Sequence, residues 1–161
     1  MLGQGALELV NSATANIVNN TEEVELKGPN RNTGFPGDPG DWVQKKIGAN
    51  YHGKMIDDWR DGNATSIKTT GGNLDRTLDQ ISHEARSLRA HNSDWEPSSD
   101  AAGKDLPTKS IAQTRTKMLI MVIPENHQSF LRNQEFLSTV EAIHDQTDVI
   151  IHVLPLPKWR R

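Results

Sequence analysis

Asp57, Ser66 and Lys68 bring a carboxylate, a hydroxyl and an ammonium group together within one short segment of the chain. A carboxylate binds a hard divalent cation through oxygen, and such a cation polarises a phosphate and lowers the pKa of a bound water. A nearby lysine orients that water or offsets the negative charge that develops on the phosphate. These residues are candidates for metal-assisted phosphodiester cleavage, although a solvated hairpin can carry the same residue types.

The sequence around these three residues predicts a β-hairpin. Residues 54–59 have the composition of a strand, residues 61–63 (Asp-Gly-Asn) that of a tight turn, and residues 64–69 that of the returning strand. An Asp-Gly pair between two such runs is a strong hairpin signal. We therefore expect the acid and the Ser-x-Lys segment to lie on adjacent strands.

The alternation of side chains along a strand decides which of these residues can meet. Successive residues point to opposite faces, so Ser66 and Lys68 share one face and Ile67 takes the other. Asp57 can lie beside that pair on the neighbouring strand. Asp58 is a rival metal ligand, but alternation places it on the face opposite to Asp57.

The remaining elements follow from apolar spacing and capping residues. Asn73 is a suitable N-cap for an amphipathic helix that ends near residues 91–92. A polar connection follows over residues 93–108. We expect buried strands over residues 117–124 and 148–154, and a helix over residues 129–144 between them. This order predicts an α/β fold with a mixed β-sheet flanked by helices.

The N-terminal quarter of the chain has a different composition. Residues 2–18 have the spacing of a short amphipathic helix, residues 21–39 are rich in Gly, Pro and Asn, and residues 41–47 suit a short helix that begins at Asp41. We interpret residues 21–39 as a linker, with an ordered surface loop as the alternative. The catalytic domain is then expected to span residues 40–161.

Composition excludes several classes of protein. The net charge of −3 is unlike that of a dedicated nucleic-acid-binding module, but a catalytic domain with acidic metal ligands is compatible with it. The lack of cysteine excludes disulfides, thiolate nucleophiles and Cys-based zinc sites. No apolar run approaches the ~20 residues of a membrane span, and residues 1–15 lack the basic start of a secretory signal.

Residues 54–69 read Lys-Met-Ile-Asp-Asp-Trp-Arg-Asp-Gly-Asn-Ala-Thr-Ser-Ile-Lys-Thr. This segment resembles the signature of restriction-endonuclease-like toxin domains at the carboxyl ends of contact-dependent growth inhibition (CdiA-type) proteins. That signature runs apolar, Asp, apolar, a short turn with Gly, and then Ala-Thr-Ser-apolar-Lys before Thr or Ser. The match is specific over residues 56–69, and a looser likeness extends over residues 41–154.

The resemblance implies a PD-(D/E)xK nuclease core in which serine replaces the second acid. It implies that Asp57 is the principal metal-binding acid, that Ser66 stands where an Asp or Glu is usual, and that Lys68 is the catalytic lysine. The family also supplies an acid, usually Glu, from the helix before the hairpin. Asp41 is the nearest substitute as a second metal ligand, with Gln44 as the alternative. The expected cofactor is a divalent metal, Mg or Zn, and the number of ions is left open.

The resemblance also implies a biological setting. Such a domain is the toxic tip of a larger secreted or cell-surface exoprotein and cleaves transfer RNA or DNA in the cytoplasm of a neighbouring bacterium. A cognate immunity protein neutralises it in the producing cell. A helper protein that presents the substrate is left open as a further partner, and no stable membrane insertion is expected. Residues 1–39 would then be an N-terminal helical segment and linker before a nuclease toxin domain of residues 40–161.

Other residues suit other chemistry. His52, just before the motif, is the candidate for a metal-independent ribonuclease in which histidine is the general acid or base. Arg86 and Arg89, three residues apart on the polar side of the predicted helix, can contact phosphates, although a solvated face paired with nearby acids explains them as well. A third interpretation is a non-catalytic binding or delivery module whose hairpin edge pairs with a partner strand.

Overall fold

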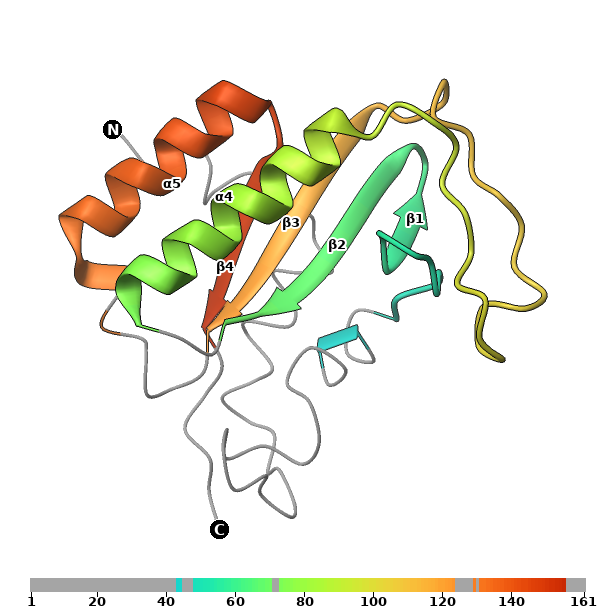
Figure 1. Ribbon diagram of the computed structural model, residues 1–161, viewed down its shortest axis with the longest axis horizontal. Coiled ribbons are helices and arrows are strands. Elements are labelled where there is room, and N and C mark those ends of the chain that lie inside the picture. The colour runs from blue at the N-terminus through green and yellow to red at the C-terminus, as the bar shows by residue number, and fades with distance from the viewer. Residues whose placement is uncertain (1–42, 45–47, 71–72, 124–128, 130, 156–161) are drawn as a thin grey trace, which may run out of the picture.

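A four-stranded mixed sheet in the order β1-β2-β3-β4 carries the predicted hairpin at one side (Figure 1). The computed structural model describes residues 43–44, 48–70, 73–123, 129 and 131–155. β1 (Asp58–Arg60) pairs antiparallel with β2 (Asn63–Thr69), and β3 (Thr116–Ile123) lies parallel to both β2 and β4 (Ile150–Pro155). The α/β class and the mixed sheet are therefore as the sequence predicts.

The hairpin turn has the backbone that its residues favour. Asp61 and Gly62 both have positive φ, 50° and 83°, and Arg60 pairs with Asn63 across them. Two central residues with φ > 0 match the right-handed twist of the strands, and Asp-Gly adopts this conformation readily. The predicted turn is confirmed.

The first strand of the hairpin is shorter than predicted. β1 begins at Asp58, not at residue 54. The preceding backbone is paired elsewhere, because Gly53 bridges Pro97 and the Lys54 amide donates to the Glu96 carbonyl at 3.0 Å. Residues 93–108, predicted as a polar connection, therefore compete with β2 for this stretch of chain.

Two helices connect the parallel strands, and both begin at an asparagine. α4 (Leu74–Ala90) starts after Asn73, whose side chain accepts from the Arg76 amide at 2.9 Å, as predicted. α5 (Gln134–Thr147) starts after Asn133, which accepts from the Phe136 amide at 3.0 Å. The predicted helix over residues 129–144 was thus placed too early, because the N-cap is Asn133.

Asp148 corrects a second boundary. It lies in the left-handed region with φ 59°, where it ends α5, and its amide donates to the His144 carbonyl at 2.8 Å. A residue in that conformation cannot open a strand, so β4 begins at Ile150 and not at residue 148.

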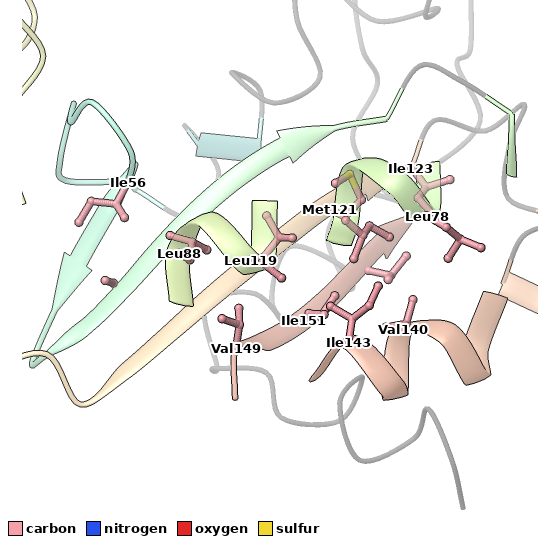
Figure 2. Close-up of a cluster of buried hydrophobic side chains, with 14 of the residues drawn as sticks. Ile56, Leu78, Leu88, Leu119, Met121, Ile123, Val140, Ile143, Val149 and Ile151 are labelled. Carbon is pink, nitrogen blue, oxygen red and sulfur yellow. The ribbon is translucent and has the colours of Figure 1, made fainter. Parts of the chain in front are cut away.

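The core lies between the sheet and the two helices, which cover one face together (Figures 1 and 2). Alternate residues of β3 and β4 meet the helices there, so the sheet is not flanked on both faces by these two elements. Burial of apolar area at roughly 25 cal/mol per Å² is the main stabilising contribution in such a layer. The strand residues of this cluster are Ala64, Leu119, Met121, Ile123, Ile151 and Val153.

Several predicted features lie outside the described residues. They are the helix over residues 2–18, the linker over residues 21–39, the domain boundary at residue 40, and Asp41. In the part of the chain that the structure describes, no helix is long and apolar enough to cross a membrane.

Candidate functional site

Asp57 is held alongside Ser66 by hydrogen bonds on both sides of that serine. The Asp57 amide donates to the Thr65 carbonyl at 2.8 Å, and the Ile67 amide donates to Asp57 Oδ2 at 2.8 Å. Asp57 directly precedes β1, so its side chain supplies an acceptor to β2 where the regular ladder ends. The sequence prediction that acid and serine are neighbours across the hairpin is confirmed.

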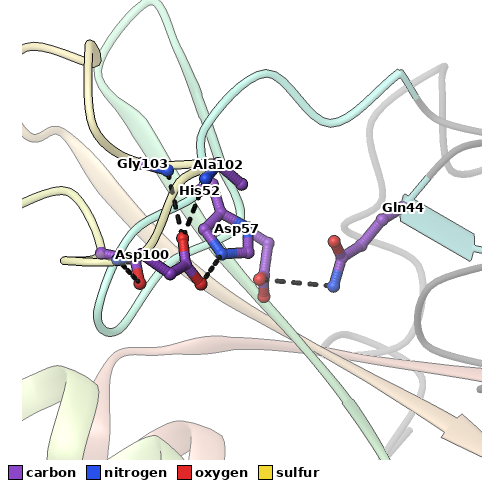
Figure 3. Close-up of polar contacts among 7 residues, drawn as sticks. Gln44, His52, Asp57, Asp100, Ala102 and Gly103 are labelled. Atoms are coloured by element: carbon purple, nitrogen blue, oxygen red, sulfur yellow. Dashed lines mark hydrogen bonds and ion pairs between the residues drawn. The ribbon is translucent and has the colours of Figure 1, made fainter.

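Gln44 contacts the other oxygen of the same carboxylate. Its Nε2 donates to Asp57 Oδ1 at 3.3 Å, as Figure 3 shows. Val43 and Gln44 are helical, in agreement with the short helix expected there. Gln44 is the alternative that the sequence offered for the family's helix acid, and an amide in this position keeps its own oxygen available as a neutral ligand.

Ser66 and Lys68 share the helix-covered face of the sheet. In the parallel register Ser66 pairs with Leu119 and Lys68 with Met121, both members of the core. Ser66 is 1% exposed, and within the described residues its hydroxyl has no hydrogen-bond partner. Lys68 is half-buried. A buried hydroxyl without a partner costs stability, and such costs are typical of functional positions.

Asp58, the alternative metal ligand, has contacts that are structural. It is 5% exposed, and its Oδ1 accepts from the Asn50 amide at 3.0 Å and from Arg60 Nε at 3.1 Å. Burial raises the pKa of the Asp58 carboxyl, while the Asn50 amide and the Arg60 charge oppose that rise. These contacts fix β1 against the loop before it.

The raised pKa of Asp58 gives a prediction for pH dependence. The folded state keeps the Asp58 proton at pH values where the unfolded chain has lost it, because the folded pKa lies above 3.8. The stability from this group is therefore present below 3.8 and is lost as pH rises through the folded pKa. Asp58→Asn removes the titration, so the free energy of unfolding of wild type relative to this variant should fall as pH rises.

Denaturant titrations of both proteins at a series of pH values from below 3.8 upward measure this difference. If the free energy of unfolding of wild type instead rises relative to that of Asp58→Asn as pH rises, burial is not the dominant cause of the pKa shift.

The oxygen atoms around Asp57 fit a hard cation. The candidates are the Asp57 carboxylate and the Ser66 hydroxyl, and Gln44 would add its amide oxygen only if the amide turned, because its nitrogen faces Asp57 (Figure 3). Mg²⁺ is commonly held by one or two carboxylates with water in its other positions, whereas structural zinc prefers sulfur and nitrogen. Within the described ranges no group of three or more His, Asp or Glu side chains could hold a metal ion.

His52 lies in a second polar cluster, formed with Asp100 (Figure 3). His52 Nε2 and Asp100 Oδ2 are 2.9 Å apart, and Asp100 Oδ1 accepts from the amides of Ala102 and Gly103. The hydrogen bond with His52 is the main cause that lowers the pKa of the Asp100 carboxyl. Sequence analysis missed Asp100, because nothing local links residues so far apart.

The two arginines of the predicted nucleic-acid contact have different surroundings. Arg86 joins the helices, since its Nε donates to Ser82 Oγ at 3.0 Å and its Nη2 to Gln146 Oε1 at 2.7 Å. Arg89, near the end of α4, lines a cavity at the other end of the sheet from Lys68. Neither arginine has a described hydrogen bond to Asp57.

Comparison with protein-family models and with curated proteins finds no match. A solved structure is similar: one chain of the "CdiA-CT/CdiI toxin and immunity complex from Yersinia pseudotuberculosis", with a TM-score of 0.50 and 13% sequence identity. The match covers 73% of this chain and 98% of that one. At this identity the likeness concerns the fold: the mixed sheet and helices of this chain are similar to those of a protein in that complex.

Proposed function

We propose that this chain is the nuclease toxin domain of a contact-dependent growth inhibition system, with its catalytic centre at Asp57, Ser66 and Lys68. The observation that carries the proposal is the pair of hydrogen bonds that fixes Asp57 on either side of Ser66. The motif in the sequence and the fold shared with a chain of the Yersinia toxin and immunity complex support it from two directions.

Each residue has a distinct part in this proposal. Asp57 anchors a divalent cation, for which the oxygen donors favour Mg²⁺ over Zn²⁺. When bound, such a cation supplies Lewis acidity and a bound water of lowered pKa. Lys68 offsets the charge that develops on the phosphate, and Ser66 supplies a hydroxyl that can orient water or ligand. Gln44 holds the Asp57 carboxylate in place through Oδ1.

The partners follow from the same proposal. The substrate is a nucleic acid, either transfer RNA or DNA, in the cytoplasm of a neighbouring bacterium. A cognate immunity protein silences the domain in the producing cell, and the similar solved structure is itself a complex of a toxin with an immunity protein. The domain is delivered as the tip of a larger exoprotein.

The His52–Asp100 pair supports a second candidate function, a metal-independent ribonuclease. A carboxylate that bonds one imidazole nitrogen orients the ring and leaves the other nitrogen for proton transfer. Both side chains are exposed, at 46% and 59%, so a substrate can reach them. The two candidates differ in one consequence, since only the Asp57 mechanism needs a cation.

Induced synthesis of the chain inside a bacterium without an immunity gene tests the toxin proposal. We expect growth to stop and either chromosomal DNA or transfer RNA to be cleaved, because the uninhibited enzyme meets its substrate directly. Normal growth with soluble, folded protein and intact nucleic acid would contradict it. Gel analysis of both nucleic acids in the same cells identifies the substrate class.

Gln44→Glu should strengthen the metal site. It places a second carboxylate where an amide now lies 3.3 Å from Asp57 Oδ1. Two carboxylates repel without a cation but share one well, so we expect metal affinity to rise by about 10- to 100-fold. Gln113→Glu, at an exposed loop position, is the charge-matched control. Calorimetric titration with Mg²⁺ measures the affinity of both variants. If Gln44→Glu binds Mg²⁺ no more tightly than Gln113→Glu, Gln44 is not part of the metal site.

A further inference from the structure

A cavity of about 570 Å³ opens at the amino-terminal end of the parallel strands, away from the candidate catalytic centre. It lies between the starts of β3 and β4 and the ends of α4 and α5, which meet at the same edge of the sheet (Figure 1). Its volume is within the range of about 300–1,000 Å³ that small-molecule sites occupy. It is therefore large enough for a ligand of nucleotide size.

The charge of the cavity is mainly positive. Arg89, Arg115 and Lys117 line it, with Asp148 as the one acid among its lining residues. Arg115 Nε donates to the Asp61 carbonyl at 3.1 Å, so its guanidinium is held in place. Burial and the nearby Arg89 charge lower the pKa of Lys117, as expected where like charges crowd together. An anion in the cavity would relieve that repulsion.

Lys117 contributes charge but few free donors. Its Nζ donates to the carbonyls of Leu88 and His91 at the end of α4, and it lies 5.5 Å from the centre of the Trp95 ring. Lys117 is thus a cap for the helix. Direct contacts to a ligand must come from other side chains of the cavity, above all Arg89.

His91 carries a ring nitrogen with no assigned partner. It stacks on Trp95 with ring centroids 4.1 Å apart, and its Nε2 is buried without a hydrogen-bond partner among the described residues. His91 lines the cavity. Because this nitrogen is closed to solvent, a phosphate in the cavity could not reach it with the ring as it stands, so His91 contributes a wall of the cavity and no hydrogen bond.

We propose that this cavity binds the phosphate of a nucleotide, either free or at the end of a nucleic-acid strand, through Arg89. Guanidinium groups match phosphate oxygens with two parallel hydrogen bonds, and Lys117 and Arg115 add positive charge behind them. The apolar side chains of Ile111, Val149 and Ile150 line the same cavity and offer contact to a sugar or base.

This site is separate from the proposed catalytic centre. Lys117 of β3 pairs with Ala64 of β2. Lys68 lies four residues after Ala64 on β2, which is about 13 Å at about 3.3 Å per residue. None of the residues that line the cavity is Asp57, Ser66 or Lys68. The inference therefore does not depend on nuclease activity, and its test can fail or succeed independently.

Calorimetric titration of the full chain in excess chelator tests the proposal with four probes. These are inorganic phosphate, adenosine monophosphate, and a short single-stranded oligonucleotide with and without a 5′-phosphate. We expect the nucleotide or the phosphorylated oligonucleotide to bind more tightly than inorganic phosphate, and the comparison of the two identifies the source. Absence of saturable binding by any probe up to about 1 mM, or no preference over inorganic phosphate, would overturn the proposal.

Two variants locate the binding. Arg89→Gln should weaken binding by about tenfold or more, while Arg76→Gln, at an exposed position of the same helix and outside the cavity lining, should leave it unchanged. Equal affinity of wild type and Arg89→Gln would refute the assignment.

Discussion

Lys68→Ala is expected to lower nuclease activity by about 10²- to 10³-fold while the protein remains folded. The lysine charge acts on the phosphate in the transition state, so its loss is felt in the rate of cleavage. Lys68 is half-buried on β2. The hairpin contacts described above do not use its ammonium group, so the hairpin should survive the substitution. Growth inhibition in cells and cleavage by purified protein are the two measurements.

Lys54→Ala is the matched control for this variant. Lys54 is exposed and pairs with Glu96 at 3.1 Å at the surface, where an ion pair contributes little stability. We expect this control to remain fully toxic. A folded Lys68→Ala protein that inhibits growth as strongly as Lys54→Ala would remove lysine from the catalytic account.

Asp57→Asn is expected to weaken metal binding by about tenfold or more and to lower cleavage steeply. The change removes one negative charge but keeps an oxygen that can accept from the Ile67 amide, now 2.8 Å from Oδ2. Gln44 can turn its amide so that its oxygen accepts from the NH₂ group that the substitution introduces, so the fold should persist. Calorimetric titration with Mg²⁺ and an activity assay report the two effects separately.

Asp61→Asn removes the same charge from the turn of the same hairpin. Asn tolerates the positive φ of this position well, so the control should keep its structure, metal affinity and activity. Unchanged metal affinity in Asp57→Asn would transfer the metal role to another acid, and Asp41 would be the next to test.

Local signals in the sequence were sufficient for much of this molecule. The hairpin turn follows from Asp61-Gly62, whose backbone is accessible to few other pairs, and α4 follows from its Asn73 cap and its regular apolar spacing. Alternation along β2 placed Ser66 and Lys68 on one face, as the register with β3 confirms. In each case the determining interaction lies within a few residues.

Contacts between distant segments could not be predicted in this way. The strand before Asp58 is short because Gly53 and Lys54 pair with residues near Glu96, and the His52–Asp100 pair joins two loops. Such contacts depend on how loops return to the sheet, which periodicity does not encode. Gln44 was named only as the alternative to Asp41 in the helix that the resemblance places before the hairpin, and its contact with Asp57 was not predicted.

One buried polar atom lies at the proposed catalytic centre itself. The Ser66 hydroxyl has no hydrogen-bond partner among the residues described. If this hydroxyl serves catalysis, Ser66→Ala should lower activity and spare stability, because the change removes a buried polar group that has no partner to lose.

Incubation of the purified chain with plasmid DNA and with total RNA, with and without excess chelator, tests the central claim most directly. The account predicts that one of these substrates is cut in the presence of Mg²⁺, that chelator stops the reaction, and that added Mg²⁺ restores it. Cleavage of RNA at the full rate in excess chelator would contradict the Asp57 mechanism and favour His52 and Asp100 instead. No cleavage of either substrate by folded protein, in Mg²⁺ or Zn²⁺, would contradict nuclease activity itself.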